Sequence, residues 1–316
     1  MDEIEIPRNF RIDGKRLDAV QTVNLRRALE HVRSQTYDKH YPDLKGRTFV
    51  PTDNSVPTGA ESVVYDSYEE LGEAEITTSY ADDAPMVDVR ADSTVLRIRG
   101  MQTKYAYTLQ ELRAAAMSGS GLIPRKALAA RKAIEQKHNK IILLGDARWH
   151  LKGLFNLSGV VTYATVAGDS TSKDWANKTP LEILADMFAM ENAISTATED
   201  AEHPNTLILP LSRHKIVKQT PMGDGMPGTI LQFFLNNSDH IKDVFNSTEL
   251  ESNSLWTGRR MVAYKRDPEY IQYVEPQPFE QLMPEHSGMR TTTVCHSRTG
   301  GVQAMYPKSI CYGDEI

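Results

Sequence analysis

The spacing of apolar residues separates an early helical segment from a long extended one. Between residues 17 and 32 apolar side chains recur at helical spacing, which predicts an amphipathic helix inside a weakly apolar arm. Residues 87–99 instead alternate apolar and charged side chains, as half-buried strands do; an earlier strand is expected around residues 63–68 and a turn at residues 81–85. A two-stranded ribbon buries little surface. The pattern therefore predicts that arm and ribbon both pack on a partner.

Two consecutive helices are expected next. Thr108 and Glu111 have the spacing of a capping box, in which each side chain satisfies a free backbone amide at a helix start. Pro124 suits the first turn of a second, longer helix reaching Leu144. Gly145 is the expected stop, because glycine readily adopts the left-handed conformation that ends a helix.

The long helix has an apolar face that contains one histidine. Most of its basic residues lie off that face, and a histidine on it is best explained as a hydrogen-bonded core residue. The face consists of Ala127, Ala130, Ile134, His138 and Ile141.

The second half of the chain mixes helices and strands without regular alternation, which predicts an α+β fold. Helices are expected at residues 179–196, 212–219 and 229–235, and strands at residues 206–211, 260–264 and 270–274. The C-terminal region predicts a strand pair, residues 291–296 and 302–306, joined across residues 298–301.

Length and composition indicate a soluble intracellular product. The chain has 316 residues, which favours two lobes over one core. It contains no apolar run near the roughly 20 residues needed to cross a bilayer, and its acidic N-terminus lacks a secretory signal. Only two cysteines occur, which excludes a disulfide framework. The net charge of −6 argues against tight whole-surface binding to nucleic acid.

Charge is concentrated in two adjacent blocks of opposite sign. Residues 61–92 hold ten acidic residues against one arginine, a net −9, and residues 97–140 hold ten basic residues against two glutamates, a net +8. Two independent solvated faces would explain each block alone. Adjacent blocks of opposite sign more readily suggest surfaces that meet, within a chain or between copies.

No convincing motif for a cofactor or metal is present. GxxxxGK[ST] does not occur. Gly223, Gly225 and Gly228 do have the spacing GxGxxG, but their loop contains a proline and no lysine, so a mobile loop is a better interpretation than a phosphate-binding one. No two histidines are spaced i, i+4, and Cys295 and His296 are strand neighbours that point to opposite faces.

One pair of residues could suggest a hydrolase. Asp146 and His150 flank a short loop after the long helix, but no nucleophile or third group accompanies them. The alternative is an architectural joint in which Asp146 caps the turn, and Trp149 and His150 pack or make contacts. We favour the joint.

The order of these elements resembles the major capsid proteins of tailed bacteriophages, whose shell fold is named for phage Hong Kong 97. In that family a spine helix ends in an apolar run and Gly-Asp, followed by Gly-Leu-Leu-Asn. The residues that carry the resemblance here are Leu143–Asp146, Gly153–Asn156, Arg298–Val302 with Tyr306-Pro307 and Ile310, and the stretches at residues 30–41, 60–62 and 80–83.

The resemblance implies a layout for nearly the whole chain. It predicts an N-terminal arm at residues 1–50, an extended loop (β-ribbon) at 51–107, a peripheral domain with the spine helix at 108–174, an axial domain at 175–275, and peripheral return strands with the C-terminus at 276–316. The loop at residues 223–228 is expected near the five- and six-fold positions. The interface candidates are Asp82, Asp83, Arg97, Arg99, Arg125, Arg131, Gly145, Asp146, Gly153, Gly223, Gly225, Gly228 and Arg298.

The implied function is structural rather than enzymatic. The chain would assemble as pentamers and hexamers into an icosahedral or prolate head, part of the virion, made in the bacterial cytoplasm and enclosing double-stranded DNA by weak contact. Scaffolding and portal proteins would be further partners, with no cofactor and no membrane. No lysine lies between Lys45 and Lys104, so covalent cross-linking through the extended loop is not expected. The arm starts near residue 1, which implies a separate scaffold or a removed leader.

The resemblance leaves a second class of shell protein open, because that class has the same fold. An encapsulin-like bacterial nanocompartment protein would enclose cargo enzymes instead of DNA, and the sequence does not separate the two.

Overall fold

The computed structural model describes residues 11–12, 15–16, 42–72, 74, 86–118, 122–169, 171–223 and 228–316. The chain divides into two units, Met1–Asp43 and Leu44–Ile316. In the first, β1 (Arg11–Ile12) and β2 (Lys15–Arg16) pair antiparallel. The amphipathic helix expected at residues 17–32 lies outside the described residues.

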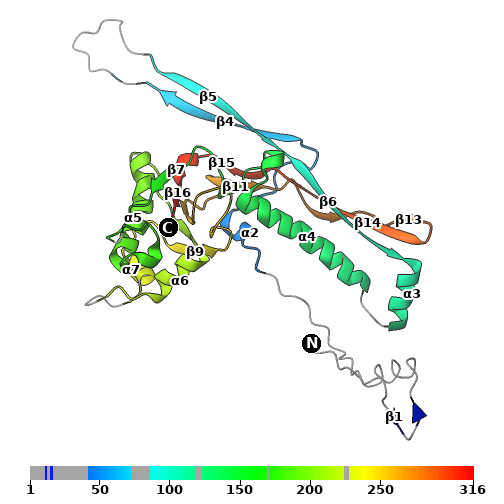
Figure 1. The fold of residues 1–316 in the computed structure, drawn as a ribbon. Coiled ribbons are helices and arrows are strands. Elements are labelled where there is room, and N and C mark those ends of the chain that lie inside the picture. The colour runs from blue at the N-terminus through cyan, green and yellow to red at the C-terminus, as the bar shows by residue number, and fades with distance from the viewer. Residues whose placement is uncertain are drawn as a thin grey trace. The chain divides into compact units, whose positions relative to one another are not determined.

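In the second unit a five-stranded sheet and three helices enclose one apolar core. The sheet order is β7 (Val161–Ala164), β16 (Ile310–Asp314), β10 (Arg260–Tyr264), β8 (Thr206–Pro210) and β9 (Asp243–Ser247). The helices are α5 (Pro180–Ala197), α6 (Leu211–Gln219) and α7 (Ile230–Asn237), gathered beside this sheet in Figure 1. Met187, Met190, Leu207 and Phe234 are fully buried between sheet and helices. The helices predicted here are confirmed within two residues.

The long helix packs on a second sheet. The helix is α4 (Leu122–Leu144), and the sheet contains β6 (Arg99–Thr108), β12 (Gln277–Gln281), β13 (Glu285–Ser287) and β14 (Arg290–Thr299). β14 pairs with β6 over ten positions, and alternate β14 residues are buried. Ala130 and Ile134 of the predicted apolar face pack against buried Cys295. As expected, Cys295 is buried whereas His296 is partly exposed.

Short segments complete this side of the unit. Helix α3 (Leu109–Ser118) begins where the capping box predicts: the Thr108 amide donates to Glu111 Oε2 at 2.9 Å, and the Glu111 amide donates to Thr108 Oγ1 at 3.2 Å. α4 begins at Leu122, two residues before the proline that marked its expected start. Helix α2 (Gly46–Phe49) is an additional short helix.

The ribbon is longer and more regular than the alternation predicts. β4 (Ser62–Leu71) and β5 (Asp88–Arg97) pair antiparallel over all ten positions and extend away from the sheets in Figure 1. Ile98, only 5% exposed, separates β5 from β6 and anchors the base. β6 leaves the ribbon to pair with β14, so strand pairing within the ribbon ends at Arg97. The turn expected at residues 81–85 lies outside the described residues.

The predicted C-terminal hairpin is wrong. β14 does not pair with β15 (Gly301–Ala304); β15 pairs with β11 (Ile271–Val274), which also pairs with β3 (Thr52–Asp53). The reason is that the chain changes sheets at Gly300–Gly301, where Gly301 has φ +81°. A Cβ on Gly300 would lie 2.9 Å from the Leu96 side chain at the ribbon base. The glycine pair signalled a turn correctly, but long-range contacts chose the partner strand.

The joint after α4 depends on two glycines whose backbones touch. Gly145 stops the helix as predicted, with φ +71°. The chain then folds back, and the amides of Leu154 and Phe155 donate to the helix-end carbonyls of Ile142 and Leu143 at 2.7 and 2.9 Å. A Cβ on Gly153 would lie 2.3 Å from the Gly145 nitrogen. Only glycine allows this approach, so the helix carbonyls are satisfied by the chain that follows.

We expect Gly153→Ala to destabilise the protein by about 2 kcal/mol or more, because the added methyl meets rigid backbone that must shift. Denaturant unfolding measures the change. Gly59→Ala is the matched control, since no atom lies within 4 Å of its Cβ position. Equal midpoints for the two variants would contradict the close approach.

Candidate assembly surfaces

One face of the ribbon carries large apolar side chains exposed to solvent. Directly opposite residues of an antiparallel pair point to the same side, so Val64 and Val95 share a face with Tyr68 and with Val89. Each of these four side chains is more than half exposed. Because a two-stranded ribbon has no core, nothing within this face covers them. An exposed apolar stripe of this kind marks a contact surface.

The same face carries charge of both signs in different places. Asp66 and Glu70 lie along it, whereas Arg97 lies on it at the base, opposite Ser62. Among the residues that the structure describes, no ion pair joins an acidic residue of the ribbon to a base. Asp82 and Asp83, the acidic pair expected at the interface, lie outside the described residues and stay a prediction.

Basic residues of α4 lie on its exposed side. Arg125 and Arg131 are exposed as the pattern predicts, and the Arg131 guanidinium lies 5.8 Å from the centre of the Phe279 ring. Lys126 pairs with Glu111 at 3.3 Å and donates to the Ala106 carbonyl at 2.9 Å. The described ion pairs of the +8 block, Lys126 with Glu111 and Lys137 with Asp146, do not involve the −9 block. A meeting of the two blocks stays a prediction.

Three candidate arginines come together at the ribbon base. Arg97, Arg99 and Arg298 line one cleft with Glu61, Val95 and Gly100. Strand pairing places Arg298 opposite Gly100, beside Arg99. We name this site the arginine cleft. The basic block had singled out Arg97 and Arg99, and the capsid resemblance Arg298; the structure brings the three together.

The loop after α4 does not present a catalytic pair. Asp146 caps a 3-10 turn, η1 (Ala147–Trp149), accepting from the Arg148 amide at 3.2 Å, and pairs with Lys137 at 2.7 Å. These contacts, that with Lys137 foremost, lower the pKa of Asp146. Among the described residues no hydrogen bond joins Asp146 to His150. The carboxylate acts as a cap, as we favoured from sequence.

The exposed Trp149 makes contacts at the joint. The guanidinium groups of Arg99 and Arg148 lie 5.6 and 5.4 Å from its ring centre. His150 is exposed and ends the turn in the left-handed region with φ 56°. The cationic contacts connect the joint to the base of the ribbon.

The glycine loop is only partly described. Gly223 and Gly228 have φ of +109° and +106°, and Pro221 and Thr229 form a bridge at its base. Gly225 lies outside the described residues. The role of this loop near symmetry axes stays a prediction.

The histidine on the apolar face of α4 is confirmed as a hydrogen-bonded core residue. His138 is 1% exposed, and its Nε2 lies 2.7 Å from Ser297 Oγ. Ser297 donates its own proton to the Gln277 carbonyl at 3.0 Å, so it accepts from Nε2, and the Tyr273 hydroxyl donates to Nδ1. Burial, with a smaller effect of Arg47, lowers the pKa of His138 to about 4. The ring is therefore neutral at pH 7.

A buried glutamate beside this histidine was missed from sequence. Glu275 is 1% exposed, accepts from Arg47 at 2.8 Å and lies 3.6 Å from His138 Nε2. Arg47 also pairs with Glu135 of α4 at 3.3 Å. Burial raises the pKa of Glu275, since Arg47 offsets the desolvation only in part. No local signal could reveal this cluster, because the partners are far apart in sequence.

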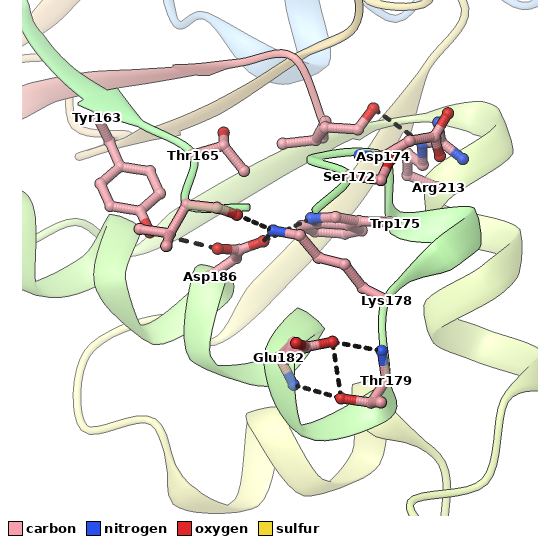
Figure 2. Close-up of polar contacts among 12 residues, drawn as sticks. Tyr163, Thr165, Ser172, Asp174, Trp175, Lys178, Thr179, Glu182, Asp186 and Arg213 are labelled. Atoms are coloured by element: carbon pink, nitrogen blue, oxygen red, sulfur yellow. Dashed lines mark hydrogen bonds and ion pairs between the residues drawn. The ribbon is translucent and has the colours of Figure 1, made fainter. Parts of the chain in front are cut away.

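A second buried polar cluster lies where α5 begins (Figure 2). Asp186 accepts from Lys178 Nζ at 2.6 Å, from Trp175 Nε1 at 2.8 Å and from the Tyr163 hydroxyl at 3.3 Å. Lys178 also donates to the Val166 carbonyl at 2.6 Å. Burial, followed by Asp186, raises the pKa of Tyr163 to about 12. This cluster is enclosed and each charge has partners, so it stabilises the fold and leaves no open position for a substrate.

The described residues contain no group of three or more potential metal ligands placed to hold an ion. Among the helices in the described part of the chain, none has the length and apolar character to span a bilayer.

These features define a protein with a mixed helix and sheet fold, a long helix, and a ribbon with an exposed apolar face. The family model for the major capsid protein matches residues 72–316. The chain belongs to this family of phage capsid proteins, and it forms part of the virion.

Solved structures show the same fold. The capsid of the Myoviridae phage XM1 has a TM-score of 0.79 at 16% identity, covering 90% of this chain and 96% of that one. The capsid of a native GTA particle has a TM-score of 0.63 at 10% identity, covering 94% and 98%. A virus-like particle from Pyrococcus furiosus has a TM-score of 0.54 at 13% identity, covering 84% and 91%. The comparison with curated proteins gives no match.

The buried pair predicts an asymmetric mutational response. Lys178→Met should destabilise the protein by about 3–5 kcal/mol, because it leaves the Asp186 charge buried without its countercharge. The double variant Lys178→Met/Asp186→Leu should recover much of that loss. Urea unfolding of the monomeric chain measures both, and a double variant less stable than the single one would contradict this role.

His138 predicts a loss of stability in mild acid. Its pKa is about 4 when folded and about 6.5 when unfolded, so the unfolded state binds more protons between these values. Its contribution, about 3 kcal/mol, is present above pH 6.5 and lost as the pH falls toward 4. The raised pKa of Glu275 acts in the opposite sense.

Urea unfolding at pH 7.5 and pH 5.0 measures this dependence. His138→Asn should be less stable at pH 7.5 and lose less stability on acidification than the unsubstituted chain. An unchanged difference between the two pH values would rule out the histidine as the source.

Proposed function

We propose that the chain assembles as pentamers and hexamers into a closed icosahedral or prolate head that encloses double-stranded DNA. The observation that carries this proposal is the exposed apolar face of the ribbon. Covering Val64, Tyr68, Val89 and Val95 requires a surface that the same ribbon does not supply. Repetition around closed symmetry makes such modest contacts collectively strong. The function needs no catalytic residue.

The domain layout follows from the same proposal. The ribbon of β4 and β5 is the extended loop lying across a neighbouring subunit, α4 is the spine of the peripheral domain, and the five-stranded sheet belongs to the axial domain. The loop at residues 223–228 meets its symmetry mates around the capsomer axis. The acidic ribbon and the exposed basic residues Arg125 and Arg131 lie on surfaces of neighbouring copies, where complementary charge guides register more than it adds affinity.

Other partners follow from a phage head assembled in the host cytoplasm. The chain would contact scaffolding and portal proteins during assembly. It would also contact the packaged DNA, weakly and without sequence specificity. The ribbon forms no covalent cross-link through a lysine, since no lysine lies between Lys45 and Lys104.

An encapsulin-like compartment is the second candidate. Its shell would have the same fold, and a virus-like particle does match, with a TM-score of 0.54. The family-model match to the major capsid protein over residues 72–316 favours the phage head. Genes for terminase and portal beside this gene would support the head, whereas a cargo-enzyme gene would support the compartment.

We expect Val64→Asp combined with Tyr68→Asp to abolish particle formation, because charges would occupy the apolar contact face. Thr94→Asp, an exposed position on the opposite face of the ribbon, is the control and should still assemble. Negative-stain microscopy and light scattering measure particle yield. An unsubstituted chain that stays monomeric at high concentration would contradict the shell, and normal particles from the double variant would contradict the contact face.

A further inference from the structure

The two faces of the ribbon have different surroundings in the same chain. Ser67, Arg90 and Asp92 line a cleft with residues of the segment 197–202, at and after the end of α5, and with residues 305–309; Tyr68 of the apolar face also lines it. Ser67 and Asp92 are paired and share the face opposite Val64 and Val95. The polar face therefore adjoins the ribbon's own subunit, whereas Val64, Val89 and Val95 of the apolar face line no part of this cleft and are available to another molecule.

The apolar face carries charges of opposite sign at its two ends. Arg97 lies at the base and Glu70 eight pairs farther out, opposite Val89. At about 3.3 Å per residue the two positions are roughly 26 Å apart. Tyr68 and Val64 lie between them. A surface with a cation at one end and a carboxylate at the other is complementary to the same surface of a second copy that runs in the opposite direction.

The basal end of this face opens into the arginine cleft. Val95 and Arg97 belong to the apolar face and line the cleft together with Arg99 and Arg298. Glu61 also lines it, but no ion pair within the described residues joins Glu61 to these arginines. Three guanidinium groups against one carboxylate leave the cleft with a net positive charge.

The hydrogen bonding of the cleft is incomplete in a single chain. Arg99 Nε is buried and has no hydrogen-bond partner among the described residues. The Arg99 guanidinium stacks near Trp149, and Arg298 donates to the Thr58 carbonyl, so two of the three groups are held in place. Positioned guanidinium groups recognise carboxylates by paired hydrogen bonds.

We propose that the arginine cleft of one copy receives the Glu70 carboxylate, with its neighbour Asp66 nearby, from the ribbon of a second copy. This inference rests on the proposed shell function. The distal half of one ribbon lies with its apolar face on the basal half of the next, pairing Glu70 with Arg97 and covering Val95. Because the same face of both ribbons meets, a two-fold axis relates the two copies and the contact is isologous: each copy's Glu70 meets the other copy's Arg97.

A charge exchange tests the pairing. Arg97→Glu and Glu70→Arg should each lower particle yield at least tenfold, because each places like charges together. The double variant Arg97→Glu/Glu70→Arg should restore at least half of the unsubstituted yield. The control variant Arg113→Glu/Glu70→Arg has the same net charge as Arg97→Glu/Glu70→Arg and should form no particles. Particles from this control would overturn the inference. A low particle yield from Arg97→Glu/Glu70→Arg would overturn it as well.

Three further readouts separate the remaining explanations. If Arg97→Glu unfolds at the same temperature as the unsubstituted chain, its loss of particles is an assembly defect. If Arg97→Glu does not fold, the single variants Arg97→Gln and Glu70→Gln are measured instead. A normal particle yield from either of these variants would overturn the pairing. Normal particle yield from Arg97→Glu with less retained nucleic acid would assign the cleft to phosphate instead. If the unsubstituted chain forms no particles, the shell function fails; if it does and the exchange has no effect, only this inference fails.

Discussion

The backbone contact between Gly145 and Gly153 is the constraint on which the rest of this structure depends. A helix end leaves carbonyl groups without partners, and here the returning chain supplies amides to Ile142 and Leu143. That return is possible only because neither glycine has a Cβ to keep the backbones apart. The direction in which the chain leaves helix α4 is thereby set by hydrogen bonds and sterics together.

The same returning segment contacts the five-stranded sheet and the three-stranded sheet of β15, β11 and β3. The Lys152 carbonyl accepts from the Val302 amide at 2.9 Å, which attaches β15 and, through it, β11. The Phe155 carbonyl accepts from Arg260 at 2.7 Å, and that arginine pairs with Asp314 across β10 and β16. Helix α4 and the sheets that would form the peripheral and axial parts of a subunit are therefore oriented by one short stretch of chain.

Features that depend on neighbouring residues could be predicted from the sequence, whereas contacts between distant residues could not. The capping residues Thr108 and Glu111 and the stop at Gly145 act within a few residues, so the sequence predicted those helix boundaries well. The strand after Gly301 was assigned to the wrong partner, since pairing with β11 depends on residues distant along the chain. Glu275 was missed for the same reason. Arg97 and Arg99 were identified from the basic block and Arg298 from the capsid resemblance, but their common cleft depends on the pairing of β14 with β6.

Polar groups are treated differently in the body of the subunit and on its ribbon. The buried charges of Lys178 and Asp186 are paired and hydrogen-bonded, which makes that region complete within one chain. The ribbon has exposed valines, a half-complete guanidinium at its base and carboxylates without countercharges among the described residues. Apolar contact would supply most of its affinity, because water weakens exposed ion pairs and salt screens them. The charges then act on orientation: they penalise shifted or wrongly oriented placements of one ribbon on the other, so that an exposed apolar surface pairs in one register instead of aggregating.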